Sequence, residues 1–217
     1  MKKRNQKINA FSLSNQRQTL YLAGADGNIW QLDMRNPQAG PQPFYQHPHH
    51  QHTFTSLAIS HNERLLSAGD EEGVLVIWDL NNNDTIKEMR IHQAPIQHII
   101  FGKADTLMAS ASLDGTVRLW HLDTRHFTPA IFPAHAFDNS VRLSDSEDAD
   151  WIWTVAFNDR QDFIWAGYRD GLIRRWAIRP RWLYDQLKKK IQRNMTLSEW
   201  NQYIGVSPAY EKTFEEY

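Results

Sequence analysis

Four histidines lie between His47 and His52, and they are the residues of this sequence best suited to hold a metal ion. Imidazole binds zinc and copper, and short His-rich tracts are typical of such sites. The chain has no cysteine, however, and no well-spaced carboxylate lies beside the cluster. We therefore expect no specific metal site in this segment.

A second candidate is the acidic segment from Asp145 to Asp150, whose carboxylate oxygens could coordinate calcium. The segment lacks the regularly spaced Asp or Asn residues and the glycine of an EF-hand loop. It lies within a polar stretch, residues 136–150, which we interpret as a loop outside the repeated structure. A solvated loop, or a contact for a basic partner, is the simpler reading of these carboxylates.

Enzymatic motifs are absent from the sequence. It contains no G-x-S-x-G, no H-E-x-x-H, no dinucleotide-binding fingerprint and no phosphate-binding G-x-x-x-x-G-K-[ST]. Without cysteine, disulfides, thiolate zinc sites and thiol catalysis are excluded. The sequence predicts a protein that is not an enzyme, with no catalytic residues, no cofactor and no metal.

Composition excludes some kinds of partner. The 24 basic and 25 acidic residues give a net charge of −1, so no overall charge draws the chain to nucleic acid or an anionic membrane. Lys188, Lys189 and Lys190 are read as a solvated helix end. No apolar run approaches the length of a membrane span and no secretory signal follows Met1. These features favour a cytoplasmic protein.

The sequence contains an internal repeat, which predicts the elements that position these residues. An acidic residue followed by glycine occurs four times, and a short apolar strand follows each pair. Glycine permits the positive φ of a tight turn, and the carboxylate can accept hydrogen bonds around it. In the last three copies, tryptophan stands six residues after the acid, whereas Leu32 occupies this place in the first. The turn pairs are Asp26-Gly27, Glu72-Gly73, Asp114-Gly115 and Asp170-Gly171.

The segments around each turn repeat as well. Two short apolar strands precede each turn, and a fourth strand fits after the second and third tryptophans, near 85–89 and 128–132. Four short strands per unit, joined by tight turns, are typical of a β-propeller blade. The predicted strands before the turns are 8–13 with 19–23, 53–59 with 65–68, 96–101 with 107–110, and 153–157 with 163–166.

This pattern resembles the WD40-repeat family. Residues 114–123, Asp-Gly-Thr-Val-Arg-Leu-Trp-His-Leu-Asp, are nearly a family consensus, and Trp78-Asp79 is the WD dipeptide itself. The resemblance covers residues 8–178 and implies a non-catalytic module that holds protein partners. It also implies a buried chain of hydrogen bonds in each blade. The residues that match this structural set are His92, Ser110 (or Ser112), Asp114 and Trp120 in the third repeat, with Trp78, Asp170 and Trp176 in the others.

The repeats depart from the family pattern at several points. Glu72 replaces the usual aspartate, and no histidine precedes the first unit, whereas His52 and His135 match the blade histidine of the second and fourth. We predict an all-β fold of about four WD40 blades, which form an incomplete ring. The predicted divisions are a basic segment at 1–7, repeats at about 8–47, 48–90, 91–134 and 135–179, and a helical tail at 180–217.

The tail is expected to hold a helix over Arg181 to Arg193 and a second short helix that opens at Thr196 with Glu199. Residues 193–213 resemble the end of bacterial WD40 proteins built on STAND-type NTPase, peptidase or TIR effector domains. That resemblance implies the C-terminal part of a larger bacterial signalling or defence protein.

Several functional readings remain open at this stage. The favoured one is a scaffold or sensor that binds a protein partner of unknown identity, with self-association or upstream blades closing the ring. Arg118, Arg174 and Arg175 are candidates to contact a partner or to bridge blades. The alternatives are a small-ligand-binding propeller that stands alone, an enzyme that uses a propeller pocket, and a truncated remnant without function.

Overall fold

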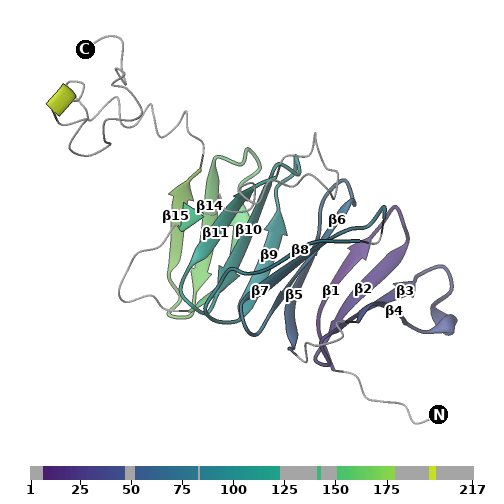
Figure 1. The fold of residues 1–217 in the computed structure, drawn as a ribbon. Coiled ribbons are helices and arrows are strands. Elements are labelled where there is room, and N and C mark those ends of the chain that lie inside the picture. The colour runs from purple at the N-terminus through teal and green to yellow at the C-terminus, as the bar shows by residue number, and fades with distance from the viewer. Residues whose placement is uncertain are drawn as a thin grey trace. The chain divides into compact units, whose positions relative to one another are not determined.

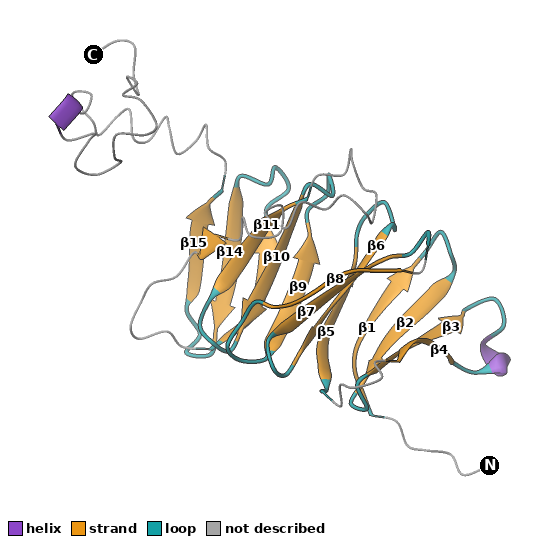
Figure 2. Ribbon diagram, viewed as in Figure 1, coloured by secondary structure: helices purple, strands orange, loops and turns teal. Residues whose placement is uncertain are grey.

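The computed structural model describes residues 7–46, 52–82, 84–122, 141–142, 151–178 and 196–198. Within these ranges the regular secondary structure is almost entirely β-strand, which confirms the predicted all-β class (Figure 2). Contacts divide the chain into one unit over Met1–Trp176 and another over Ala177–Tyr217. All four sheets belong to the first unit, apart from the last residue of the final strand.

Each sheet is an antiparallel meander in which successive strands pair, and the sheets follow one another in chain order (Figure 1). The first sheet contains β1 (Ile8–Ser14), β2 (Thr19–Gly24), β3 (Asn28–Asp33) and β4 (Gln42–Gln46), with a short 3₁₀ helix at Pro37–Ala39. The second contains β5 (Phe54–Ile59), β6 (Leu65–Asp70), β7 (Val74–Asp79) and β8 (Asp84–Arg90).

The third sheet contains β9 (Ile96–Phe101), β10 (Leu107–Ser112), β11 (Val117–His121) and β12 (Val141–Arg142). In the fourth, the described strands are β13 (Ile152–Phe157), β14 (Phe163–Tyr168) and β15 (Ile173–Ala177). Sheets of four short antiparallel strands have the form of β-propeller blades, as predicted.

Two turns in each sheet require a left-handed backbone. The turn between the second and third strands carries glycine, for example Gly73 with φ of 81°. The turn between the first and second strands instead places a non-glycine residue at φ of 50–54°: Gln18, Glu63, Asp105 and Gln161. The same backbone hydrogen bond, from the amide of this residue to the carbonyl three residues earlier, closes all four turns, so they share one turn type that ends in a left-handed residue.

The core lies between neighbouring sheets. We call the face of a sheet that packs on the preceding sheet its front face, and the face toward the following sheet its rear face. In the second sheet, the front face carries Leu66 and Trp78, which pack in one cluster with Tyr21 and Ile29 of the first sheet. The alternate residues of the same strands form the rear face, where Leu65, Leu75 and Ile77 pack with Ile99, Met108 and Trp120. The twofold alternation of strand side chains thus fills both sides of an inner sheet.

One prediction about the 136–150 segment is wrong. We expected a loop outside the blades, but Val141 and Arg142 form the outer strand of the third sheet, with Val141 opposite Leu119 and Arg142 opposite Arg118. The polar composition of the segment hid a two-residue strand, because an outer strand is fixed by backbone pairing to its neighbour rather than by an apolar pattern. The alternative outer strand at 128–132 lies outside the described residues.

The predicted helical tail is not established. The first tail helix, 181–193, lies outside the described residues, and of the second only 196–198 are described, with helical backbone at Leu197 and Ser198. Among the residues that the structure describes, no helix is long and apolar enough to cross a membrane.

Candidate functional site

The turn of the third sheet brings three of the predicted residues together. His92 enters from the loop before β9, where its Nδ1 lies 2.9 Å from Oδ2 of Asp114 and its Nε2 lies 2.8 Å from Oγ of Ser110. Thr116 completes the network, because its hydroxyl donates to Asp114 at 2.7 Å. The Thr116 contribution was not predicted, although its position two residues after the turn acid was a usable signal.

Burial controls the protonation of this network. Burial lowers the pKa of His92 below its ordinary value, although the hydrogen bond and the charge of Asp114 act in the opposite direction. Burial alone would raise the pKa of Asp114, but hydrogen bonds from His92, Thr116 and the Gln93 amide hold it well below its ordinary range. At neutral pH the pair is therefore a neutral imidazole that donates from Nδ1 to a carboxylate. The His92 side chain has no exposed surface, so no substrate can reach it.

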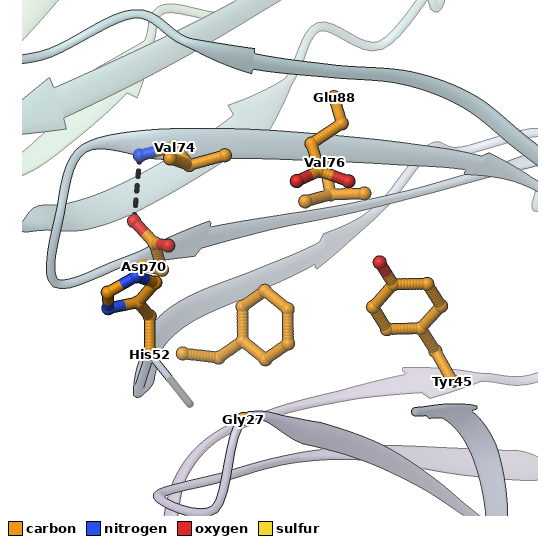
Figure 3. Close-up of a pocket in the computed structure, with 8 residues that line it drawn as sticks. Gly27, Tyr45, His52, Asp70, Val74, Val76 and Glu88 are labelled. Carbon is orange, nitrogen blue, oxygen red and sulfur yellow. Dashed lines mark hydrogen bonds between the residues drawn. The ribbon is translucent and has the colours of Figure 1, made fainter. Parts of the chain in front are cut away.

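The turn of the second sheet uses a different acid from the one expected. Asp70, not Glu72, accepts the backbone amides of Val74 at 2.7 Å and Glu72 at 2.9 Å, and His52 lies beside it (Figure 3). Glu72 points outward and pairs with Arg90 at 3.0 Å. Burial raises the pKa of Asp70, against the pull of these two amides and of His52. The signal missed in the sequence was that Asp70 occupies the place of Ser112, two residues before the turn acid.

The turns of the first and fourth sheets are simpler. Asp26 accepts the Asn28 amide at 3.2 Å, and Asp170 accepts the Leu172 amide at 2.9 Å. His135, the candidate partner of Asp170, lies outside the described residues. Trp78 and Trp120 are fully buried between sheets, whereas Trp176 is only partly buried. The structure thus assembles the predicted set most completely in the third sheet.

Carboxylates also fasten each inner sheet to the one before it, which sequence reasoning did not find. Oε1 of Glu63 accepts the Asn15 and Gln16 amides of the first sheet at 3.0 and 3.1 Å, and Ser14 donates its hydroxyl to the same carboxylate. One sheet later, Asp105 accepts the His61 and Asn62 amides, both at 2.7 Å. We call these contacts turn clasps. Both accepting carboxylates, those of Glu63 and Asp105, belong to residues with positive φ.

Two hollows that described residues line lie between sheets. The smaller, between the first and second sheets, is lined by Tyr45, His52, Phe54 and Asp70 among others (Figure 3). Its volume is about 10 Å³, which is room for one water molecule and not for a ligand. Burial, with the Glu88 carboxylate nearby, raises the pKa of Tyr45 to about 12, so its phenol stays protonated.

The larger hollow, which we call the cleft, lies between the third and fourth sheets beside the turn clasps and has a volume of about 250 Å³. Apolar and polar side chains both line it. Lys103 and Asp159, which we call the rim, form an ion pair of 2.6 Å that joins the two sheets. The apolar lining consists of Ile100, Phe101, Val155, Ala156 and Phe157, and the polar lining of His61, Lys103, Asn158, Asp159 and Gln161.

The size of the cleft limits what it can hold. Its volume is below the roughly 300–1,000 Å³ typical of small-molecule pockets, but it can take one or two apolar side chains. The hydrogen bond and the charge of Lys103 lower the pKa of Asp159, so this rim carboxylate is ionised at neutral pH.

The candidate arginines act mainly within their own sheet. Arg174 lies over the Tyr168 ring at 4.8 Å, and Arg175 lies over Phe163 at 4.5 Å and Trp165 at 5.3 Å. The fourth sheet therefore accounts for both as cation–π contacts. Arg118 is partly buried on β11, opposite Arg142 of β12. In the part of the chain that the structure describes, no group of three or more His, Asp or Glu residues is arranged to hold a metal, and His47, His49 and His50 lie outside it.

Comparison with known proteins identifies the repeats. The family model for the WD domain, G-beta repeat, matches residues 41–79 and 83–121. Each matched segment starts with the outer strand of one sheet, β4 or β8, and continues through the three inner strands of the next. Residues 41–79 and 83–121 are therefore WD40 repeats, and each of these two segments links neighbouring sheets covalently.

Three relatives show how widely this pattern occurs. The chain is 35% identical over 68 residues to the mouse NACHT domain- and WD repeat-containing protein 1, which is 31% of the chain and 4% of that protein. It is 25% identical over 122 residues to the small ribosomal subunit protein RACK1 of Candida albicans, covering 56% and 36% of the two chains. It is 34% identical over 70 residues to zebrafish DNA damage-binding protein 2, covering 32% and 14%. The matched regions span well under two thirds of these relatives.

A solved structure supports the fold independently. The crystal structure of the computationally designed Ika4 protein superposes with a TM-score of 0.61 and covers 82% of this chain and 96% of that one. Sequence identity is 20%, so the likeness concerns the fold alone.

Proposed function

Because the chain carries WD40 repeats, we propose that it is a non-catalytic scaffold whose sheets hold a protein partner, and that the partner inserts an apolar side chain into the cleft. The observation that carries this proposal is the cleft itself, which combines an apolar lining with a charged rim at a boundary between two sheets. An anchor side chain that is desolvated in such a hollow and surrounded by polar contacts is typical of protein interfaces.

The predicted set of residues is assigned a structural role in this proposal. His92, Ser110 and Asp114 hold the third turn together by hydrogen bonds, and Trp120 packs in the core between the second and third sheets. Trp78, Asp170 and Trp176 occupy the corresponding places in the other repeats. A His–Asp pair with a serine invites comparison with a catalytic triad. The buried His92 side chain argues against that reading, because a nucleophile and its base must reach the substrate.

Selection of peptides on the immobilised 217-residue chain tests the cleft. A library of random displayed peptides is expected to yield binders that share one large apolar side chain. Two substitutions should each weaken their binding at least about tenfold, or 1.4 kcal/mol: Ile100→Arg, which places a charge in the apolar lining, and Lys103→Glu, which inverts the rim charge and breaks the pair with Asp159.

Met34→Asp is the matched control, since Met34 is exposed and lies outside the lining of the cleft. Circular dichroism establishes that every variant is folded. Lys103 is mostly exposed, so its variant tests the rim even if Ile100→Arg does not fold. Failure of the library to yield any binder, or binders that tolerate both substitutions, would contradict the assignment of the cleft.

The cellular context is a further part of the proposal. The tail resemblance favours the C-terminal part of a larger bacterial signalling or defence protein. The name of one relative, which joins a NACHT domain to WD repeats, gives a parallel for such an arrangement. Sequencing of the coding DNA upstream tests it. An in-frame effector domain would support the idea, and an unrelated neighbouring gene would contradict it.

A further inference from the structure

The two terminal sheets each expose an apolar face that inner sheets bury. On the first sheet, Phe11 lies opposite Leu22, and Leu22 lies opposite Trp30, so these three side chains share one face. Leu13, Leu20 and Leu32 form the next row of that face. Phe11 is 69% exposed and Leu13 is 47% exposed.

Register identifies this surface as a front face. With the turn glycines aligned, Leu20 and Leu32 of the first sheet correspond to Leu66 and Trp78 of the second, and both of the latter are buried against the first sheet. The first sheet thus presents the kind of surface that packs on a preceding sheet. Among the described sheets, none lies in front of it.

The fourth sheet shows the opposite face. Phe163, Ile173 and Arg175 correspond to Leu65, Leu75 and Ile77, which the second sheet buries against the third. Here Ile173 is 70% exposed and Trp165, on the same strand as Phe163, is 38% exposed. The fourth sheet therefore presents a rear face that no other described sheet covers, the complement of the front face on the first sheet.

We propose that a second copy of this chain covers both faces: the front face of each first sheet packs on the rear face of the other copy's fourth sheet, so that two chains close one ring. The proposal continues the front-to-rear contact that joins the sheets within the chain. A second copy is the favoured occupant because one chain supplies both complementary faces, and a twofold axis then forms both contacts at once.

The turn clasps provide a second, independent observation. Gln18 has the left-handed backbone of Glu63 and Asp105, with φ of 50° against 54° and 53°, and it stands at the corresponding position of the first sheet. In the fourth sheet, the backbone position that corresponds to His61 is Asp159. When two copies form the ring, Gln18 of one copy lies at the Asp159 turn of the other. There its side-chain oxygen can accept backbone N–H hydrogen bonds, as the carboxylates of Glu63 and Asp105 do within the chain.

The test is the mass of the full 217-residue chain by light scattering after size exclusion. We expect a dimer for the unaltered chain and for Met34→Asp, and a monomer for Phe11→Asp and for Ile173→Asp. Both altered side chains are mostly exposed, so each variant should fold, as circular dichroism will show.

Mixing the two monomeric variants tests whether a front face packs on a rear face. The Phe11→Asp chain keeps an intact rear face and the Ile173→Asp chain an intact front face, so the mixture should regain dimer through one interface. Gln18→Glu should lower the dissociation constant of the closed dimer about 30-fold, because hydrogen bonds to charged groups exceed neutral ones by about 1 kcal/mol and the dimer contains this contact twice.

A monomeric unaltered chain, an assembly without a defined mass, or a mixture that stays monomeric would overturn the proposal. A dimer that only one of the two substitutions disrupts would also overturn it, since it would indicate a like-to-like contact. The proposed peptide site lies between the third and fourth sheets of one copy, so peptide binding can fail while dimerisation succeeds, and the reverse.

Discussion

The boundary between the second and third sheets and the open faces of the first and fourth are built from corresponding residues, yet they have opposite environments. At the inner boundary, Leu75 and Trp120 are almost completely buried, and a Cβ on Gly69 would come within 2.6 Å of Ile96. At the open faces, Phe11 and Ile173 are mostly exposed. The difference shows that burial of an apolar side chain in this molecule depends on whether a neighbouring sheet covers it, and not on the strand that carries it.

Truncation of tryptophans should show the largest contrast. Trp120→Ala is expected to lower the free energy of unfolding by about 3–5 kcal/mol, because it leaves a large cavity between two sheets. Trp165→Ala should lower it by about 1 kcal/mol or less, since Trp165 is partly exposed and mainly loses its contact with Arg175. Urea unfolding below the concentration at which chains associate measures both. Equal losses would show that the inner boundary is not the more tightly packed one.

Alanine at two turn glycines sharpens the comparison, because both have the same positive φ. Gly171→Ala should cost about 1–2 kcal/mol, which is the left-handed backbone alone, since nothing surrounds that position. Gly73→Ala should cost about 1–3 kcal/mol more, because the new Cβ would collide with the His92 carbonyl group of the next loop. Thermal unfolding of both variants gives the difference directly. Similar melting temperatures would mean that the loop before β9 yields easily.

Acid should weaken the inner network specifically. Since burial lowers the pKa of His92 in the folded chain, the unfolded chain binds more protons as the pH falls below the ordinary value of 6.5. The stabilisation is therefore complete above pH 6.5 and is lost as the pH falls through the lowered pKa. His92→Gln should be less stable at pH 7.5 but should lose less stability between pH 7.5 and 5.5. Parallel pH profiles of the two proteins would contradict a neutral buried His92.

The smallest expected effects concern the turn clasps. Glu63→Gln should cost about 1 kcal/mol, because a neutral amide replaces a carboxylate that accepts several hydrogen bonds. Gln161→Glu is the reciprocal change at the boundary of the third and fourth sheets, where the Gln161 side chain already approaches Gly102. It should leave stability unchanged or raise it slightly. Denaturant midpoints of both variants decide whether charge at this position matters.

The strands and tight turns were predictable because their signals are local. Alternating apolar residues and a glycine after an acid specify a hairpin within about ten residues, and the spacing from His92 to Asp114 repeats a family pattern. The part that could not be predicted depends on partners distant in sequence. In the sequence, Glu63 looks like an ordinary polar turn residue. Its role depends on the Asn15 and Gln16 amides, which the folded first sheet places beside it.

The second turn and the outer strand of the third sheet show the same limit. Asp70 and Glu72 are both plausible acids for their turn, and only the direction of each side chain decides which one faces the backbone amides. Val141 and Arg142 are too few to show the alternation of apolar and polar residues that predicts a strand. Pairing with β11 defines this strand instead. The features that the sequence did not predict are those that depend on contacts between residues distant in the sequence.

The central claim is that the front face of the first sheet and the rear face of the fourth are built to pack on another sheet, as the second and third sheets pack on each other. Oxidative footprinting of the full chain over a range of protein concentrations tests this claim most directly. The account predicts that Trp78 and Trp120 stay unreactive throughout, and that Phe11 and Trp165 react in dilute solution and become protected together at one concentration. Met34 should react equally at all concentrations. Protection of Phe11 without Trp165, or reactivity of both at every concentration, would contradict the account.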